Sequence, residues 1–146
     1  MDQTAKDFVS KKRIAVVGAS RSGKKFGNSA YKELKQRGYQ VYLVHPEATE
    51  IEGEPCYPNL QAVKDKVDGV FVSVPPAKGV EVLKQASEAG LINIWIQQQG
   101  DSPEMLAVGK DLGLNLVHGR CILMYAEPVS SFHSFHRFFV RLSGKY

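Results

Sequence analysis

Short apolar runs alternate with amphipathic segments along the chain. Five runs are typical of fully buried strands, because each is four to six residues long, rich in Val and Ile, and bounded by turn residues. They cover residues 13–17, 40–44, 69–74, 92–96 and 114–117. Strands that alternate with helices across short connections predict a parallel sheet with helices on both faces.

Helix boundaries follow from capping residues and from glycines that stop helices. Asn28 or Ser29 is the expected N-cap of the first long helix, and Gly38 is its stop. Ser102 followed by Pro103 begins a later helix. The expected helices are a short opening segment, residues 28 to 38, 60 to 66, 80 to 90, 102 to 113 and about 129 to 142.

Length and composition limit this arrangement to one domain. The 146 residues, 43% apolar and 23% charged, have ordinary globular composition, and a single domain is expected over residues 1–146. We expect a doubly wound, Rossmann-like parallel sheet of about five strands in three α/β/α layers, with strand order 3-2-1-4-5. The winding then reverses at the first strand, and a ligand would lie outside the carboxyl ends near it.

Neither a membrane nor an oxidising compartment is indicated. No apolar run approaches the ~20 residues of a membrane-spanning helix, and the N-terminus lacks a basic segment followed by a long apolar one. Cys56 and Cys121 lie 65 positions apart, without Cys-x-x-Cys spacing. We expect a cytoplasmic protein with no membrane partner.

The positive charge of the chain is local. Residues 8–32 contain seven Lys or Arg and no acid, while the remainder has 12 basic and 15 acidic residues, so the net charge of +4 comes from this one segment. A duplex-binding protein usually spreads its basic residues along a face or groove, so nucleic acid is not expected. The pattern favours one compact anion held at one loop, and a solvated basic surface is the alternative.

A glycine-rich turn follows the first strand. Gly18-x-Ser20-x-x-Gly23 is the dinucleotide-binding fingerprint with serine in place of its middle glycine, and it stands between a strand and a helix as required. Small residues let backbone N–H groups approach a pyrophosphate, and the helix N-terminus adds partial positive charge. The turn is therefore expected to hold phosphates, and a glycine turn without a ligand is the alternative.

The end of the second strand narrows the class of ligand. NAD sites carry Asp or Glu there for the ribose hydroxyls, whereas this chain has His45 and Pro46. A phosphorylated ribose, as in NADP or coenzyme A, is better tolerated without that carboxylate. The other strand ends also supply no Asp or Glu as a general base, so a binding site is favoured and no catalytic residue is assigned.

The same turn approximates the phosphate loop of nucleotide hydrolases. Gly18 and Gly23-Lys24 have the right spacing. However, Lys25 stands where those enzymes need a Ser or Thr hydroxyl on magnesium, and the third strand ends without a metal-binding Asp. ATP hydrolysis is therefore not expected.

Four segments of the sequence belong together: the Gly-Ala-Ser turn, Val44-His45-Pro46, Val74-Pro75-Pro76, and Gln97 with Gly100. In this combination they resemble the small coenzyme A-binding domain proteins and the N-terminal domain of the succinyl-CoA synthetase alpha chain. The resemblance covers about residues 10 to 125. It implies a Rossmann-like coenzyme A-binding module without ligase chemistry, because the phosphorylated histidine of the synthetases lies in a further domain.

The resemblance also implies the residues of the site. Residues 18–25 would wrap the phosphates, His45-Pro46 would lie beside the nucleotide, and Val74-Pro75-Pro76 would line the path of adenine and pantetheine. The expected cofactor-binding residues are Gly18, Ala19, Ser20, Arg21, Ser22, Lys24, Lys25, His45, Pro46, Val74, Pro75, Pro76, Gln97 and Gln98. The chain departs from the family pattern at His45, where Asn is usual, and at Gly119, where an acid is frequent.

Three further features have simpler explanations than a site. Cys121 lies near the expected ligand and could exchange with its thiol, but a small buried residue is favoured. His133 and His136 lack a third metal ligand at convincing spacing, so no metal is expected. Phenylalanines recur at helical spacing over residues 132–139, which favours packing within the chain first, dimerisation second and lipid contact last.

The sequence therefore predicts a protein that binds coenzyme A or an acyl-CoA and has no catalytic activity of its own. A homodimer is left open. Two alternatives from other classes also stay open, namely an NADP-dependent oxidoreductase and an interaction protein that needs no ligand.

Overall fold

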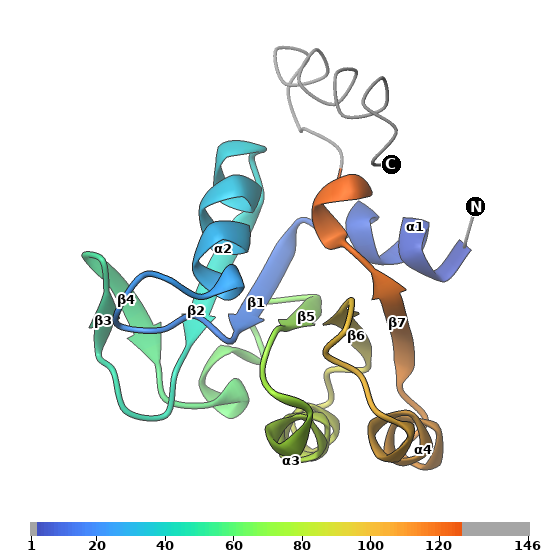
Figure 1. The fold of residues 1–146 in the computed structure, drawn as a ribbon. Helices are drawn as coiled ribbons and strands as arrows, with labels where there is room; N and C mark the ends of the chain where they lie inside the picture. The colour runs from blue at the N-terminus through green and yellow to red at the C-terminus, as the bar shows by residue number, and fades with distance from the viewer. Residues whose placement is uncertain (1–2, 127–146) are drawn as a thin grey trace.

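The computed structural model describes residues 3–126, in which a strand-rich centre is covered by helices on two sides (Figure 1). The helices are α1 (Gln3–Ser10), α2 (Phe26–Gln36), α3 (Pro76–Glu88) and α4 (Pro103–Asp111), with short 3-10 helices η1 (Leu60–Val63) and η2 (Ile122–Met124). The strands are β1 (Arg13–Val17), β2 (Gln40–Val44), β3 (Glu50–Ile51), β4 (Glu54–Tyr57), β5 (Gly69–Val72), β6 (Asn93–Gln97) and β7 (Asn115–Arg120). The helix expected over 129–142, with its histidines and phenylalanines, lies outside the described residues.

All the described strands belong to one sheet, in the order β3-β4-β2-β1-β5-β6-β7. Every neighbouring pair is parallel except the β3–β4 hairpin. Helices α1 and α2 with η2 cover one face, and η1, α3 and α4 cover the other (Figure 1). This confirms the predicted doubly wound, Rossmann-like α/β fold, with seven strands rather than about five.

The predicted strand order of 3-2-1-4-5 is wrong. The third predicted strand, β5, pairs with β1 on the side away from β2, with Val16 opposite Phe71. The reason lies in residues 47–58, which lie outside the five predicted strands but contain β3 and β4. Because β4 takes the outer edge of β2, with Leu43 opposite Cys56, the next strand pairs with the other edge of β1. The winding therefore reverses between β1 and β5.

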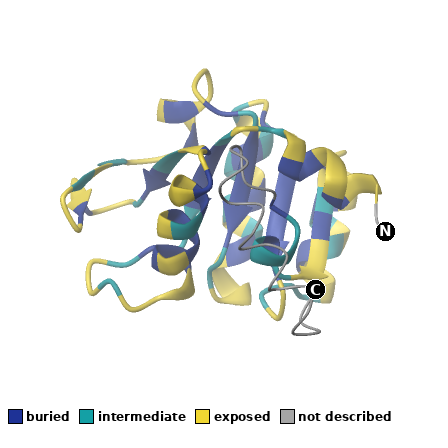
Figure 2. Cartoon of the chain, turned by 90° about the horizontal axis from the view of Figure 1, so that it is seen from above, coloured by how far each residue is buried: buried dark blue, intermediate teal, exposed yellow. Residues whose placement is uncertain are grey.

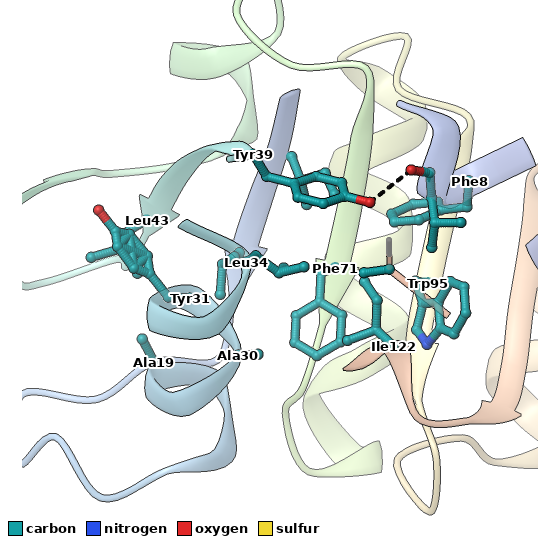
Figure 3. Close-up of a cluster of buried hydrophobic side chains, with 14 of the residues drawn as sticks. Phe8, Ala19, Ala30, Tyr31, Leu34, Tyr39, Leu43, Phe71, Trp95 and Ile122 are labelled. Carbon is teal, nitrogen blue, oxygen red and sulfur yellow. Dashed lines mark hydrogen bonds between the residues drawn. The ribbon is translucent and has the colours of Figure 1, made fainter. Parts of the chain in front are cut away.

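Aromatic side chains dominate the core on the α1 and α2 face of the sheet (Figure 3). Phe8 packs edge-on against Trp95, with ring centroids 5.5 Å apart. The Tyr39 hydroxyl donates a hydrogen bond of 2.8 Å to the Val9 carbonyl, so this polar group is satisfied inside the core. Buried positions follow the central strands, whereas the outer sides of the helices are exposed (Figure 2). The sheet therefore presents a fixed platform from which the loops at its ends project.

Helix α2 begins earlier than expected. Its N-cap is Lys25 rather than Asn28 or Ser29, and Asn28 is already the third residue of the helix. The end of the helix is as predicted, because Gly38 follows it at φ +95°. The start of α4 is also confirmed, since the Ser102 hydroxyl accepts a 3.1 Å hydrogen bond from the Met105 amide.

Candidate functional site

The strand order brings the predicted site residues together at one edge of the sheet. Strands β2, β1, β5 and β6 are consecutive neighbours, so the segments that follow them lie side by side at their carboxyl ends. In the predicted order, Val74-Pro75-Pro76 would have been separated from the glycine-rich turn by another strand. In the structure the two segments are adjacent, because β5 pairs directly with β1.

Gly18 occupies the closest approach between these two segments. The Ser73 amide donates a 2.8 Å hydrogen bond to the Val17 carbonyl, which extends the β1–β5 pairing to the end of both strands. A Cβ on Gly18 would overlap the Ser73 carbonyl, and the φ of +131° disfavours side chains as well. Glycine is therefore required here by the backbone of β5, independently of any ligand.

Asn28 ties the two ends of the glycine-rich loop together. Its Oδ1 accepts hydrogen bonds from the backbone amides of Ser20 at 2.9 Å and Lys25 at 3.3 Å, and its Nδ2 donates to the Ser20 carbonyl at 3.0 Å. The side chain is only 4% exposed. The sequence suggested Asn28 as a helix cap, since an Asn side chain near a helix start often bonds backbone groups. It did not indicate that these groups belong to Ser20 and Lys25, at the two ends of the loop.

Gly27 lets α2 pack directly on the loop. A Cβ at this position would lie 2.6 Å from the carbonyl carbon of Gly18 and 2.7 Å from the Ala19 amide nitrogen. Sequence reasoning missed this glycine, because it lies four residues beyond the fingerprint and inside a helix. Its requirement comes from the tertiary contact alone.

Several donors of the loop are left unused by the protein. Within residues 3–126, no hydrogen bond uses the backbone N–H groups of Arg21 or Ser22, or those of Phe26 and Gly27 in the first turn of α2. The loop itself is ordered by a 2.7 Å contact between the Ser20 and Ser22 hydroxyls and by a turn from Ser20 to Gly23. A short loop with free N–H groups beside a helix N-terminus suits an anion.

The basic side chains of the loop also keep their charge available. Lys24 and Lys25 are exposed, and no carboxylate in the described part of the chain pairs with either. Arg21 lies 4.0 Å from Glu47, with both side chains largely exposed, so that contact is weak. The local excess of positive charge seen in the sequence is therefore present at the loop in space.

One acidic side chain reaches the loop from the β3–β4 hairpin, which the sequence did not predict. Glu52 and Gly53 form the tip of the hairpin at φ +51° and +83°. The Glu52 carboxylate lies against Gly23, where a Cβ would overlap it, and pairs with Lys32 at 2.6 Å. Because Lys32 balances this carboxylate, the net charge facing the loop stays positive.

His45 shapes the turn after β2. Its Nδ1 accepts hydrogen bonds from the backbone amides of Glu47 at 3.0 Å and Ala48 at 2.9 Å. An Asn side chain makes the same kind of turn with its carbonyl oxygen, so histidine can replace it at this position. Because Nδ1 is an acceptor in both bonds, the neutral ring carries its proton on Nε2.

The side chains of the segments that follow β5 and β6 differ in how far they are exposed to solvent. Pro75 is the N-cap of α3 and Pro76 its first residue, and both are exposed beside the half-buried Val74. Gln98 is exposed, whereas Gln97 is 7% exposed and accepts a 3.1 Å hydrogen bond from the Ile122 amide through Oε1. Cys121, expected to be buried, is half-buried and free of any disulfide.

The expectation that these strand ends lack an acid needs correction. Asp101, four residues beyond the end of β6, lies 3.1 Å from Nδ1 of His118 on β7. The sequence separated the two residues by 17 positions, and only the pairing of β6 with β7 brings them together. The pair is exposed enough to reach solvent, at 43% for His118 and 28% for Asp101.

Two features are absent from residues 3–126. No group of three or more His, Cys, Asp or Glu is placed to hold a metal ion. None of the helices has the length and apolar character to cross a bilayer.

Residues 12–127 match a protein family described as the CoA binding domain. The chain belongs to this family. The match covers both the glycine-rich loop and the segments that follow β2, β5 and β6.

Known proteins agree with this assignment. An ADP-forming acetate–CoA ligase from Archaeoglobus fulgidus is 31% identical over 86% of the chain and 20% of the ligase, so the chain spans a fifth of that relative. A conserved hypothetical protein from Pyrococcus furiosus is 38% identical, with a TM-score of 0.72, over 77% of this chain and 97% of the other. An acetyl-coenzyme A synthetase from Candidatus Korarchaeum cryptofilum is 29% identical, with a TM-score of 0.62, over 73% of this chain and 25% of the other.

Proposed function

We propose that the protein binds coenzyme A or an acyl-CoA at the carboxyl edge of its sheet and performs no chemistry alone. The observation that carries the proposal is the loop of residues 18–25. It presents unused backbone N–H groups, a helix N-terminus and the unpaired cations of Lys24 and Lys25 at the point where the winding of the sheet reverses. Membership of the CoA binding domain family supports the choice of ligand.

Each neighbouring segment has a part in this proposal. The loop binds the diphosphate, with Ser20, Arg21 and Ser22 at its tip. His45-Pro46 lies beside the nucleotide, in a turn that the His45 ring fixes. Val74-Pro75-Pro76 lines the adenine and pantetheine path, and Gln98 lies beyond it on an exposed turn. A ligand with a phosphorylated ribose is favoured over one with a free ribose diol, because β2 is not followed directly by Asp or Glu. The carboxylate of Glu52 is neutralised by Lys32.

The residues in and beside the loop are the reason that we expect binding without ATP hydrolysis. Lys25 occupies the position of the magnesium-binding hydroxyl of nucleotide hydrolases, and β5 leads into Val74-Pro75-Pro76 rather than an acid. The purified protein is therefore expected to release no phosphate from ATP and magnesium above the level of a Lys24→Ala variant. Sustained release that depends on Lys24 would contradict this part of the proposal.

The test of the ligand is mass spectrometry of small molecules released from protein purified under native conditions. We expect coenzyme A or an acyl-CoA in amounts that scale with the protein. A nicotinamide dinucleotide in its place would support the oxidoreductase alternative. Protein that carries nothing, and that coenzyme A does not stabilise, would support the interaction protein.

We also propose a cytoplasmic location, because Cys56 and Cys121 are both free thiols that lie in different parts of the fold. Cell fractionation with an antibody to the protein tests it. The expected result is recovery with the soluble fraction, and recovery with the membrane pellet would overturn the proposal.

A further inference from the structure

Gln97 is a buried amide of which only the oxygen has a hydrogen-bond partner among residues 3–126. The residue is the last of β6 and is 7% exposed. Its Oε1 accepts a 3.1 Å hydrogen bond from the Ile122 amide, which joins the end of β6 to the start of η2. Because a backbone N–H can only donate, this bond fixes which end of the Gln97 amide is oxygen.

The other end of the amide, Nε2, has no partner in the described part of the chain. None of the hydrogen bonds among residues 3–126 uses it. A primary amide nitrogen carries two donor hydrogens, and buried polar groups without a partner are rare in folded proteins. An acceptor from outside the protein would satisfy it.

The position of Gln97 suits a ligand held by the glycine-rich loop. Only β5 lies between β1 and β6, so strands spaced by about 4.8 Å place the two carboxyl ends roughly 10 Å apart. Apolar side chains line the same face of the sheet. Phe26, at the start of α2, is 39% exposed and contacts Phe71, while Ile122 lies between Phe71 and Trp95 (Figure 3).

A ligand that extends from the loop toward Gln97 therefore passes the exposed Phe26 ring, above the buried Phe71, and then meets a buried hydrogen-bond donor. The arm of coenzyme A has this pattern, since it alternates aliphatic carbons with carbonyl groups and is longer than the gap between the two strand ends. A carbonyl oxygen can only accept hydrogen bonds and Nε2 of Gln97 can only donate them, so the two groups are complementary.

We propose that Gln97 is a specificity-determining residue whose Nε2 donates a hydrogen bond to a carbonyl oxygen on the arm of the bound coenzyme. The inference rests on the proposed function, because it requires the diphosphate to lie in the loop of residues 18–25. The carbonyl belongs either to an amide of the pantetheine arm or to the thioester of an acyl-CoA. Gln97 thus distinguishes ligands that carry the arm from nucleotides that lack it.

The experiment measures affinity by titration calorimetry for four ligands. They are coenzyme A, acetyl-CoA, S-ethyl-CoA and adenosine 3′,5′-bisphosphate, which lacks the arm. Gln97→Glu keeps an oxygen for the Ile122 amide and removes the nitrogen donor, and pH 8 keeps the new carboxyl from acting as a donor. Gln97→Met removes both groups at similar volume. Gln36→Glu, at the exposed last residue of α2 and away from the glycine-rich loop, is the control for added charge.

Both Gln97 variants are expected to bind coenzyme A about tenfold more weakly, because one hydrogen bond to a buried donor is lost. Affinity for adenosine 3′,5′-bisphosphate should stay the same in both, and Gln36→Glu should leave all four affinities unchanged. If the carbonyl is that of the thioester, wild-type protein will prefer acetyl-CoA over S-ethyl-CoA, and the variants will lose that preference. Equal losses for coenzyme A, acetyl-CoA and S-ethyl-CoA assign the carbonyl to the pantetheine arm.

Unchanged coenzyme A affinity in folded Gln97 variants would overturn the inference while leaving the proposed function intact. Failure of wild-type protein to bind coenzyme A would instead refute the proposed function. If neither variant folds, the side-chain amide resonances of Gln97 in wild-type protein decide the matter. They should move on addition of coenzyme A but not of adenosine 3′,5′-bisphosphate, and equal responses to both ligands would contradict the inference.

Discussion

At the scale of single residues, the candidate site separates side chains that face a ligand from those that build the loop. Lys24 and Lys25 are exposed and unpaired within the described residues, whereas Asn28 is buried and uses its amide entirely on the backbone. Under the proposed function, the first kind of residue contributes to ligand affinity without affecting the fold. The second kind affects both, because the loop has its shape only while Asn28 holds it.

Replacing both Lys24 and Lys25 with Ala should weaken coenzyme A binding by at least about tenfold and leave the fold intact. Charge-assisted hydrogen bonds contribute roughly 1.5–3 kcal/mol each, so the loss of one such bond already weakens binding about tenfold. Titration calorimetry measures the loss, and added salt should reduce the difference from wild type. The pair Lys64→Ala and Lys66→Ala, which changes net charge equally, is the control. Unchanged affinity in the Lys24 and Lys25 variant would make the basic loop a solvated surface.

Asn28→Ala should lower the free energy of unfolding by about 2 kcal/mol or more. The change leaves the amides of Ser20 and Lys25 and the Ser20 carbonyl without their partner, and each unsatisfied buried group costs about 1–3 kcal/mol. Urea denaturation followed by circular dichroism measures the change. Ser29→Ala, on the exposed side of α2, should stay within about 0.5 kcal/mol of wild type. Equal effects of the two substitutions would contradict this role of Asn28.

At the scale of elements, the sequence predicted which segments are strands and helices better than how they are arranged. Runs such as residues 13–17 and 69–72 are buried on both faces, so their apolar character alone identified them. Residues 47–58 are polar and contain proline, which hid β3 and β4. The strand order could not be predicted because it depends on the pairing of β4 with the edge of β2. The contact between Glu52 and Gly23 could not be predicted either, because Glu52 lies on the hairpin of β3 and β4.

Gly27→Ala should destabilise the protein by roughly 1–3 kcal/mol, although alanine is normally the better residue in a helix. The added methyl group would press on the backbone of Gly18 and Ala19, which cannot move without disturbing the end of β1. Thermal unfolding measures the loss, and weaker coenzyme A binding should accompany it. A variant as stable as wild type would show that α2 does not depend on this close approach.

The Arg13–Asp68 pair should make stability depend on pH at the acidic end. Arg13 donates to both carboxylate oxygens, at 2.7 and 3.0 Å, and these hydrogen bonds lower the pKa of Asp68. A lowered pKa in the folded state adds stability above the unfolded pKa of about 4, and this is lost as pH falls through the folded pKa.

Melting temperatures of wild type and Asp68→Asn, measured from pH 7 down to pH 2, test that prediction. Wild type should be the more stable of the two near neutral pH, and the difference should shrink below about pH 4. Because both side chains are about 40% exposed, the effect will be modest. A difference that is the same at every pH would show that the pair does not titrate as described.

At the scale of the whole molecule, charge and topology lead to the same edge of the sheet. The local excess of positive charge lies at the loop after β1, and the winding reverses between β1 and β5 at the same end. The sequence supplied both the loop and its charge, whereas the adjacency of Val74-Pro75-Pro76 to the loop came only from the observed strand order. We therefore propose that this edge binds a ligand with several phosphates and a long arm in preference to a dinucleotide with two unphosphorylated riboses.

The most direct test of this account compares the melting temperature of the protein with coenzyme A and with NAD at equal concentration. Stabilisation follows RT ln(1 + [L]/Kd), so a ligand present at ~100 times its Kd adds roughly 2.7 kcal/mol. We expect coenzyme A to raise the melting temperature clearly more than NAD, because the loop is basic and no carboxylate ends β2 to receive a ribose diol. Equal shifts from the two ligands, or no shift from coenzyme A, would contradict the account.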